Sequence, residues 1–228
     1  WLLDGEILHR DSLGSEQVIR PGQLNLMTAG HGVAHSEEAS PTYRGALHGV
    51  QLWVAQPSST RHGDAAFEHH GELPRLELGA ATATVLVGEF ATVTSPARRD
   101  TEHVGVDLEL RPGETAVALV PAFEYALVVF DGVVSVGSHV LEPGHLGYLG
   151  TGRDEASLRA EQATRALLIG GVPFPEPILM WWNYVARDRN EIDDAHADWL
   201  GGRARFGRVA SPLEPLTVGP PPWAAGTG

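Results

Sequence analysis

The sequence predicts an all-β protein that contains a duplicated β domain and one short helix near its C-terminus. Candidate strands are short and recur about every ten residues, which is typical of a sandwich or barrel. A unit of strand, turn, strand, turn and strand occurs twice. Gly (27) and Pro (16) are frequent among the 228 residues, as a fold with many tight turns requires.

The repeat is visible in two pairs of turns. Leu3–Glu6 contains Asp-Gly and is followed by Ile19–Leu24, which contains Pro-Gly. Phe130–Val133 and Leu141–Leu146 repeat this order. Asp-Gly between apolar runs predicts a hairpin, because both central residues of a type I′ turn need positive φ, and Pro-Gly sets a second sharp turn. We also expect the sequence to begin within a strand, at Trp1–Leu3.

Further strands are expected where short apolar runs lie between turn residues. The candidates are Gly49–Ala55, Thr82–Phe90, Gly105–Leu110, Glu124–Phe130 and Thr164–Gly170. The polar stretch Ser58–Gly71 is predicted to be a linker or long loop.

One helix is predicted near the C-terminus. Asn190 is its expected N-cap, and acidic residues in the first turn suit the helix dipole. Ile192, Ala195 and Trp199 fall on one face, and Gly201 ends the helix. We expect a surface helix that covers one of the two β domains.

Composition narrows the functional classes. The net charge is −13, from 16 basic and 29 acidic residues, which argues against direct binding to nucleic acid. No apolar run is long enough for a membrane helix, so no membrane partner is expected. The chain has no cysteine, so a metal site must use His and carboxylate ligands. We predict a cytoplasmic protein, with which the lack of cysteine is compatible.

The most informative segment for chemistry is Met27–Glu37. Residues two apart on a strand point to the same face, so His35 and Glu37 can enter one pocket. Imidazole and carboxylate donors suit a non-haem iron site. Spacing alone does not identify the site, because a His is followed two residues later by an acid at four other places: His9/Asp11, His62/Asp64, His70/Glu72 and His196/Asp198.

Ordered motifs along most of the chain resemble the pirin family. In the N-terminal part these are Asp4-Gly5, His9–Gly14, Arg20–Gly22, Met27–Gly30, His35–Glu37 and Gln51–Val54. In the C-terminal part they are Gly170–Ile178, Trp182-Asn183, Glu191-Ile192 and Arg205–Gly207.

The resemblance implies two cupin barrels in tandem, each a double-stranded β-helix or jelly roll. Residues 1–100 would form the N-terminal cupin, incomplete at its start. Residues 101–210 would form the C-terminal cupin, and residues 211–228 a loosely ordered tail. One Fe(II) is expected in the first barrel, held by three His and one Glu. Two of these ligands match His35 and Glu37, and the other two form a His-x-His pair upstream of Trp1. No ligand set is expected in the second barrel, where Gly147–Gly150 has no His-x-Glu.

Other residues have competing interpretations. His9 matches a family position that is not a ligand, so we expect a hydrogen-bonded structural His. His31 is either a polar group at the pocket mouth or a loop residue, and we favour the loop. Gln51 and Trp53 share a strand face and are predicted to bind substrate, although Trp53 could equally be core. Further His residues are expected to be structural (His48) or solvated (His69 and His70).

The resemblance leaves three functions open. The first is an oxygenase of the quercetin 2,3-dioxygenase type, in which Glu37 is both ligand and catalytic residue and takes the hydroxyl proton of a flavonol-like molecule. The second is a non-enzymatic iron or redox sensor that binds a transcription factor or a metabolic enzyme. The third is a cupin with no metal role. Of these we prefer the first two.

Overall fold

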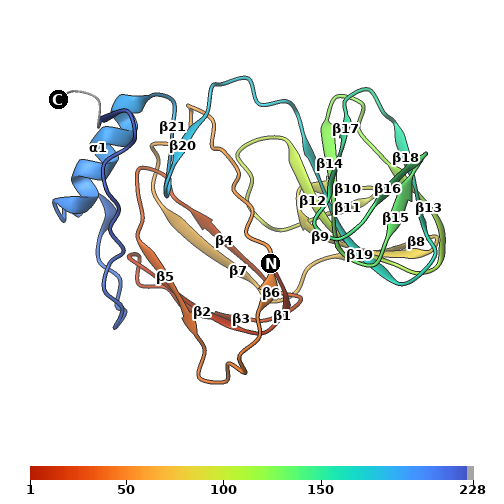
Figure 1. Ribbon diagram of the computed structural model, residues 1–228, viewed down its shortest axis with the longest axis horizontal. Helices are drawn as coiled ribbons and strands as arrows, with labels where there is room; N and C mark the ends of the chain where they lie inside the picture. Colours follow the sequence, from red (N-terminus) through yellow and green to blue (C-terminus); the bar gives the residue numbers. More distant parts are fainter. Residues whose placement is uncertain (225–228) are drawn as a thin grey trace. The chain divides into compact units, whose positions relative to one another are not determined.

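The computed structural model describes residues 1–224, which form strands, one α-helix and one short 3-10 helix (Figure 1). The predicted all-β class with one helix is therefore confirmed. The chain divides into two compact units. The first unit contains residues 1–69 and the segment from residue 175 onward, and the second contains residues 70–174. Residues 70–100, which were expected in the first cupin, thus lie in the second unit, where β9 (Ala81–Val87) pairs with β12 (His103–Leu110).

The first unit is built from short strands in small sheets. Its three-stranded sheet has the order β3-β2-β5, and the pairs β1-β6, β4-β7 and β20-β21 form the others. The strands are β1 (Leu2–Asp4), β2 (Ile7–Asp11), β3 (Glu16–Ile19), β4 (Leu24–Thr28), β5 (His35–Ala39), β6 (His48–Gly49), β7 (Ala66–His70), β20 (Leu179–Trp181) and β21 (Tyr184–Ala186).

The second unit has longer strands and a larger apolar core. Its main sheets have the orders β17-β14-β19-β12-β9-β8 and β13-β18-β15-β16, and β10 pairs with β11. Each order has two ends, so these sheets are open and not closed barrels. Besides β12, the strands are β8 (Arg75–Leu78), β9 (Ala81–Val87), β10 (Glu89–Phe90), β11 (Val93–Thr94), β13 (Gly113–Ala118), β14 (Glu124–Asp131), β15 (Val134–Val136), β16 (His139–Leu141), β17 (Leu146–Gly150), β18 (Glu155–Ala160) and β19 (Thr164–Gly171).

The structure repeats the same sheet in both units, as the sequence predicts. β2 pairs with β3 and β5, and β15 pairs with β16 and β18. The registers correspond: Ile7 faces Ile19, and Val134 faces Leu141. The predicted duplication is therefore present in strand pairing as well as in turn residues.

The Asp-Gly turns have a different role from the one predicted. β1 pairs with β6 and not with β2, and β14 pairs with β17 and β19 and not with β15. Gly5 and Gly132 have φ values of 84° and 76°, as the turn requires. At both places the chain leaves one sheet and enters another, so the hairpin prediction is wrong and the hairpins lie one connection later, at β2–β3 and β15–β16.

Most predicted strands are present, and two local predictions are wrong. Four of the expected strands are present. The one expected from residue 82 is β9 and β10, and those expected from residues 105, 124 and 164 are β12, β14 and β19. The strand expected at Gly49–Ala55 ends at Gly49, because the apolar side chains from Leu52 to Val54 are exposed and do not alternate. The predicted linker contains β7, where the Nδ1 atom of His69 lies 2.7 Å from the side-chain oxygen of Asn25, so His69 is not simply solvated.

The helix α1 spans Arg189–Leu200. Its N-cap is Asp188 and not the predicted Asn190, since Asp188 Oδ1 accepts a 3.1 Å hydrogen bond from the Glu191 backbone N–H. Ile192 and Ala195 are buried as expected, and Gly201 is the C-cap of the helix. The 3-10 helix η1 (Ala204–Phe206) follows. Within residues 1–224, no helix is long and apolar enough to cross a membrane.

The segment after residue 211 is tied to α1, contrary to the expectation of a loosely ordered tail (Figure 1). Trp199 Nε1 donates to the Leu216 carbonyl at 2.8 Å, and Trp223 Nε1 donates to Asp193 Oδ1 at 2.9 Å. These bonds anchor the tail to α1 at Leu216 and Trp223. Residues 225–228, which the prediction also included, lie outside the described part.

Candidate metal centre

Strands β2 and β5 bring four polar side chains to one face of their sheet. His9 lies opposite Glu37, and Asp11 lies opposite His35. Directly opposed side chains of an antiparallel pair lie on the same side, as do side chains two apart on one strand. His9, Asp11, His35 and Glu37 therefore share a face, while Arg10 and Glu38 lie on the opposite face and bond each other at 2.8 Å.

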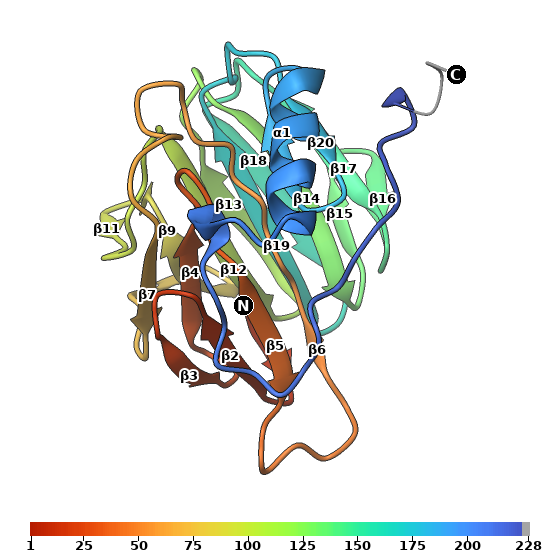
Figure 2. The same ribbon diagram turned by 90° about the vertical axis from the view of Figure 1, so that its left-hand side faces the viewer.

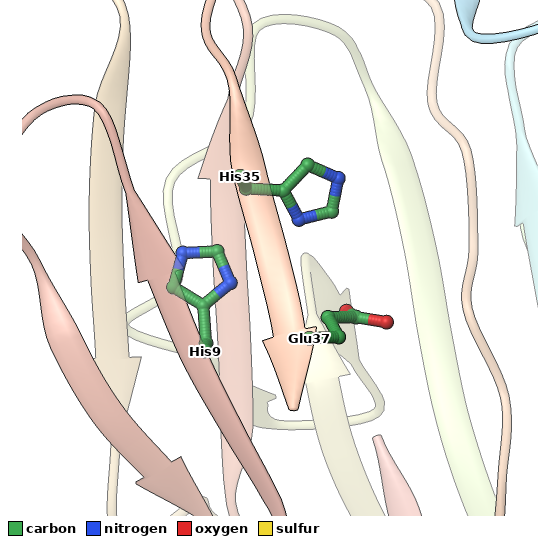
Figure 3. Close-up of side chains that lie close together, drawn as sticks. All are labelled: His9, His35 and Glu37. Carbon is green, nitrogen blue, oxygen red and sulfur yellow. The ribbon is translucent and has the colours of Figure 1, made fainter. Parts of the chain in front are cut away.

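Three of these side chains form a cluster that could hold a metal ion (Figure 3). The candidate ligand atoms of His9, His35 and Glu37 all lie within 4.8 Å of one another. Two donors on one ion lie at most about 4.2 Å apart, twice a bond length of about 2.1 Å. Small side-chain shifts therefore bring the three donors into range.

The donor set fits a first-row transition metal. Two imidazoles and one carboxylate form the set that non-haem Fe(II) oxygenases use, with coordination positions left open. His9 is buried, whereas His35 and Glu37 are exposed. Ligand or oxygen could therefore approach from the side of His35 and Glu37.

His9 is the member of the cluster that sequence reasoning missed. Its Nε2 lies 3.2 Å from Asp11 Oδ2, and its ring stacks on Phe67 with centroids 4.4 Å apart. The predicted hydrogen bond is thus present, but the ring also lies beside His35, with centroids 5.6 Å apart. Spacing along the chain shows only that His9 is paired with Asp11. The proximity of His9 to His35 depends on the register between β2 and β5, which spacing does not show.

Asp11 supplies a buried negative charge beside the cluster. Burial alone would raise its pKa, but hydrogen bonds from the Ser15 and Leu13 backbone and from His9 outweigh burial and lower the pKa. Asp11 is therefore ionised at neutral pH. A negative charge next to imidazoles favours a bound cation.

His35 is in the form that a metal needs. Partial removal of its imidazole from water lowers the pKa of His35, and this outweighs the opposing charge of Glu37. The neutral imidazole binds metals, whereas the protonated one does not. His35 is therefore ready to act as a ligand at neutral pH.

The predicted substrate residues differ in how they relate to the cluster. Gln51 Nε2 donates a long hydrogen bond of 3.4 Å to Glu37 Oε1. Trp53 is 51% exposed, so the alternative that it is ordinary core is wrong. Both residues lie outside any strand, and their substrate-binding role stays a prediction.

His31 and His48 do not belong to this cluster. His31 is an exposed turn residue, as the loop interpretation predicts: its backbone N–H donates to the Gly63 carbonyl at 2.9 Å, and its carbonyl accepts from Arg205 Nε at 2.8 Å. His48 lies in β6 and is exposed.

Two regions of the chain match models of one family. Residues 1–54 match the model named Pirin, and residues 105–207 match the pirin C-terminal cupin domain. A protein of Caulobacter vibrioides named "Pirin-like protein" is 35% identical over 211 residues, which cover 90% of this chain and 73% of that protein. The chain belongs to the pirin family.

Other similar proteins carry an enzymatic name. A Pseudomonas aeruginosa protein named "Putative quercetin 2,3-dioxygenase PA1205" is 45% identical over 225 residues, covering 98% of this chain and 71% of that protein. The crystal structure of a quercetin 2,3-dioxygenase from Acinetobacter baumannii superimposes with a TM-score of 0.93 at 42% identity, covering 97% of this chain and 75% of that one. Pirin and quercetin 2,3-dioxygenase relatives imply a metal ion, for which the cluster of His9, His35 and Glu37 offers a site.

Proposed function

We propose that this pirin-family protein is an Fe(II)-dependent oxygenase of the quercetin 2,3-dioxygenase type that acts on a flavonol-like substrate. The observation that carries the proposal is the cluster of two imidazoles and one carboxylate on one face of β2 and β5. The names of the relatives from Pseudomonas aeruginosa and Acinetobacter baumannii support the same reaction.

Two ligand sets for Fe(II) are open. His9, His35 and Glu37 form one set within this chain. The family resemblance implies another, in which His35 and Glu37 join a His-x-His pair upstream of Trp1 and His9 is not a ligand. His35 and Glu37 belong to both sets, so substituting them should abolish binding in either case, whereas substituting His9 distinguishes the two.

Glu37, Gln51 and Trp53 would have separate roles in the proposed reaction. Bound iron would supply a Lewis acid and a site for dioxygen. Glu37 would take the proton from the flavonol hydroxyl, and the amide of Gln51 would hold the Glu37 carboxylate in place through their hydrogen bond. The exposed ring of Trp53 offers an apolar surface against which a flat aromatic substrate can stack.

The test is metal content and oxygen uptake with quercetin in air. We expect about one Fe(II) per chain and quercetin-dependent oxygen uptake, both lost in His35→Ala and Glu37→Gln. Glu38→Gln is the matched control, because Glu38 is next to Glu37 on β5 but on the opposite face. Iron without oxygen uptake would overturn the oxygenase, and no bound iron would overturn both metal-based functions.

A second candidate is an iron-responsive regulator that binds a transcription factor or metabolic enzyme. It is favoured by the exposed loop that directly follows β5, which extends away from the strands of the first unit (Figure 2). Tyr43 and Leu47 in this loop are 43% and 46% exposed. An exposed apolar loop that directly follows a strand with candidate metal ligands could report the state of the metal to a protein partner. The net charge of −13 fits a protein partner rather than DNA, and we keep the cytoplasm as the predicted compartment.

A further inference from the structure

We propose that Arg205 of η1 is a positioning residue for the candidate metal centre, because it holds the loop that leads into His35. The hydrogen bonds between η1 and this loop belong to the chain itself. Their importance for a metal rests on the proposed function, and His35 is a ligand in both of the sets that are open for Fe(II).

The backbone position of His35 depends on the loop before it. His35 is the first residue of β5 (Figure 3), and residues 29–34 connect β4 to β5. The strand pairing between β2 and β5 ends with Asp11 opposite His35. Backbone groups of the loop therefore need other hydrogen-bond partners.

The 3-10 helix η1 supplies two of these partners from a distant part of the sequence. Arg205 Nε donates a 2.8 Å hydrogen bond to the carbonyl of His31, 174 residues away along the chain. The backbone N–H of Ala34, directly before His35, donates to the Phe206 carbonyl at 3.0 Å. Ala34 and Phe206 also belong to one buried cluster. The loop is thus bonded to η1 at two points close to His35.

The loop has a glycine where η1 comes close. A Cβ added at Gly32 would lie 3.1 Å from Arg205 Cγ and 3.1 Å from Phe206 Cδ1. Contacts this short would force one of the two segments to shift, because packed atoms leave no free space. The missing side chain at Gly32 therefore allows η1 to lie directly against the loop.

The guanidinium of Arg205 is held in place from the side of α1. Its Nη1 donates to Asp198 Oδ2 at 3.5 Å, and its central carbon lies 5.2 Å from the centroid of the Phe206 ring. The planar fork of an arginine can bond two acceptors at once in a fixed geometry. Here it joins a carboxylate of α1 to a backbone carbonyl of the loop, so that α1 and the loop are linked through one side chain.

A purely structural alternative is that Arg205 only stabilises the first unit. The loop has further bonds, among them the His31 N–H to the Gly63 carbonyl at 2.9 Å, which could hold it without η1. In that case the loss of Arg205 would lower the free energy of unfolding but would leave the metal centre of the folded protein unchanged. Arg205→Met separates the two roles, because it keeps an apolar stem for packing and removes every donor.

Arg203→Met is the matched control. Arg203 Nη1 donates to the same carboxylate, at Asp198 Oδ1, over 2.9 Å. Its side chain is 71% exposed, and within residues 1–224 no hydrogen bond joins it to the loop before β5. An effect seen in Arg205→Met but not in Arg203→Met therefore comes from the contact with the loop and not from the ion pair with Asp198.

The experiment uses the full chain and two readouts. In the metal-free protein, hydrogen exchange of the Ala34 N–H, followed by NMR, should be faster in Arg205→Met, while the amides of β12 are unchanged. In a titration with Co²⁺ alone, the affinity should fall by about 10-fold, the lower end of the loss typical for an outer partner of a ligand, and the visible absorption of bound Co²⁺ should change. Gly32→Ala, which disturbs the contact from the loop side, should act in the same direction, and Arg203→Met should change neither readout.

Two results would overturn the inference. One is a folded Arg205→Met protein in which the exchange of the Ala34 N–H and the Co²⁺ affinity are both unchanged. The other is an equal loss in Arg203→Met, which would assign the effect to Asp198. If Arg205→Met does not fold, the same two readouts on Arg205→Lys decide, because lysine keeps the charge but has no fork for two acceptors.

Failure of the proposed function has a different signature. If the exchange and Co²⁺ results hold while no oxygen is consumed with quercetin, the oxygenase function fails and the positioning role of Arg205 stands. If the wild type binds neither iron nor Co²⁺, both metal-based functions fail, and a normal exchange rate of the Ala34 N–H in Arg205→Met would then also remove the role of Arg205 in holding the loop.

Discussion

The two units contain equivalent sheets whose corresponding positions carry polar residues in the first unit and apolar residues in the second. In the first unit, Ile7 of β2 pairs with Ala39 of β5. In the second, Val134 of β15 pairs with Ala160 of β18. Counting along the strands from these matched pairs gives one set of equivalent positions: His9, Glu37 and His35 correspond to Val136, Leu158 and Ala156.

These equivalent positions have opposite environments. Leu158 and Ala156 are 1% and 7% exposed and belong to the apolar core of the second unit, and Val136 packs against it. In the first unit, the same positions carry the candidate metal ligands, two of which are exposed. The first unit has a smaller cluster of buried residues, which includes Ala34, Phe206 and Ile192 of α1. One scaffold position thus serves packing in one copy and candidate chemistry in the other.

The largest expected effect on stability comes from exchanging the apolar and the acidic residue at the equivalent positions 158 and 37. Leu158→Glu buries an unpaired charge in the second unit and should lower the free energy of unfolding by about 4 kcal/mol or more. Glu37→Leu, the reverse exchange, should change it by less than about 0.5 kcal/mol while abolishing metal binding. Urea unfolding at pH 7 and Co²⁺ titration measure both. Similar costs at the two positions would contradict the comparison.

Substituting the Asp-Gly glycine by alanine should lower the free energy of unfolding by a similar amount in both units, and by less than Leu158→Glu does. A Cβ at Gly132 would clash with the backbone of Ala163 and the side chain of Thr164, and one at Gly5 would clash with the carbonyl of Ala46. Alanine at either should cost about 3 kcal/mol. Urea unfolding of the four single variants Gly5→Ala, Gly132→Ala, Gly22→Ala and Gly144→Ala tests this pattern.

The Pro-Gly glycines are the matched controls. At Gly22 and Gly144 a Cβ would meet no atom within 4 Å, although both have positive φ. Alanine there should cost only about 1 kcal/mol. If the Pro-Gly position proves the costlier one in either unit, the two turns do not play equivalent roles.

The smallest effect concerns acid. The first unit is held partly by ion pairs: Arg61 donates hydrogen bonds of 2.8 and 2.5 Å to Glu191, and these lower the pKa of Glu191 from 4.5 to about 2. A depressed carboxyl pKa stabilises the fold above the unfolded value of 4.5, and this stability is lost as the pH falls toward 2. The pair is partly exposed and screened by solvent, so its contribution should be under about 1 kcal/mol.

Hydrogen exchange measured at pH 6 and pH 3 should therefore show protection lowered more around Arg61 and α1 than in the core of the second unit. In Glu191→Gln the protection around α1 should already be lower at pH 6 and should change less with pH. Equal loss of protection in both units at pH 3 would show that the ion pairs of the first unit do not set its acid sensitivity.

Apolar runs and turn residues in the sequence predicted much of the fold, because the burial of a strand determines which of its residues are apolar. β12, β14 and β19 follow from their apolar runs, and the turn residues reveal the duplication. Strand partners depend on contacts between distant residues, so the sequence did not show that the Asp-Gly turns join different sheets. The docking of the tail was missed for a related reason: Trp199 and Trp223 bond to groups 17 and 30 residues away, and a Pro- and Gly-rich composition carries no sign of such bonds.

The candidate site was predicted in part. His35 and Glu37 are brought together by the alternation of a single strand, which spacing along the chain can show. His9 joins them only through the pairing of β2 with β5. Gln51 lies within reach of Glu37 without the strand that the prediction assumed, since a loop can bring a side chain to a site as well as a strand can.

The turn that holds Asp11 also offers a place for a reporter group. Leu13 uses only its backbone N–H in this turn, and its side chain is 49% exposed. The chain has no cysteine, so Leu13→Cys would carry the single thiol of the sequence. A nitroxide or fluorophore attached there would lie two residues from Asp11, at a distance where a paramagnetic ion quenches or broadens its signal. Metal arrival at this sheet could then be followed in real time, without substrate and without relying on turnover.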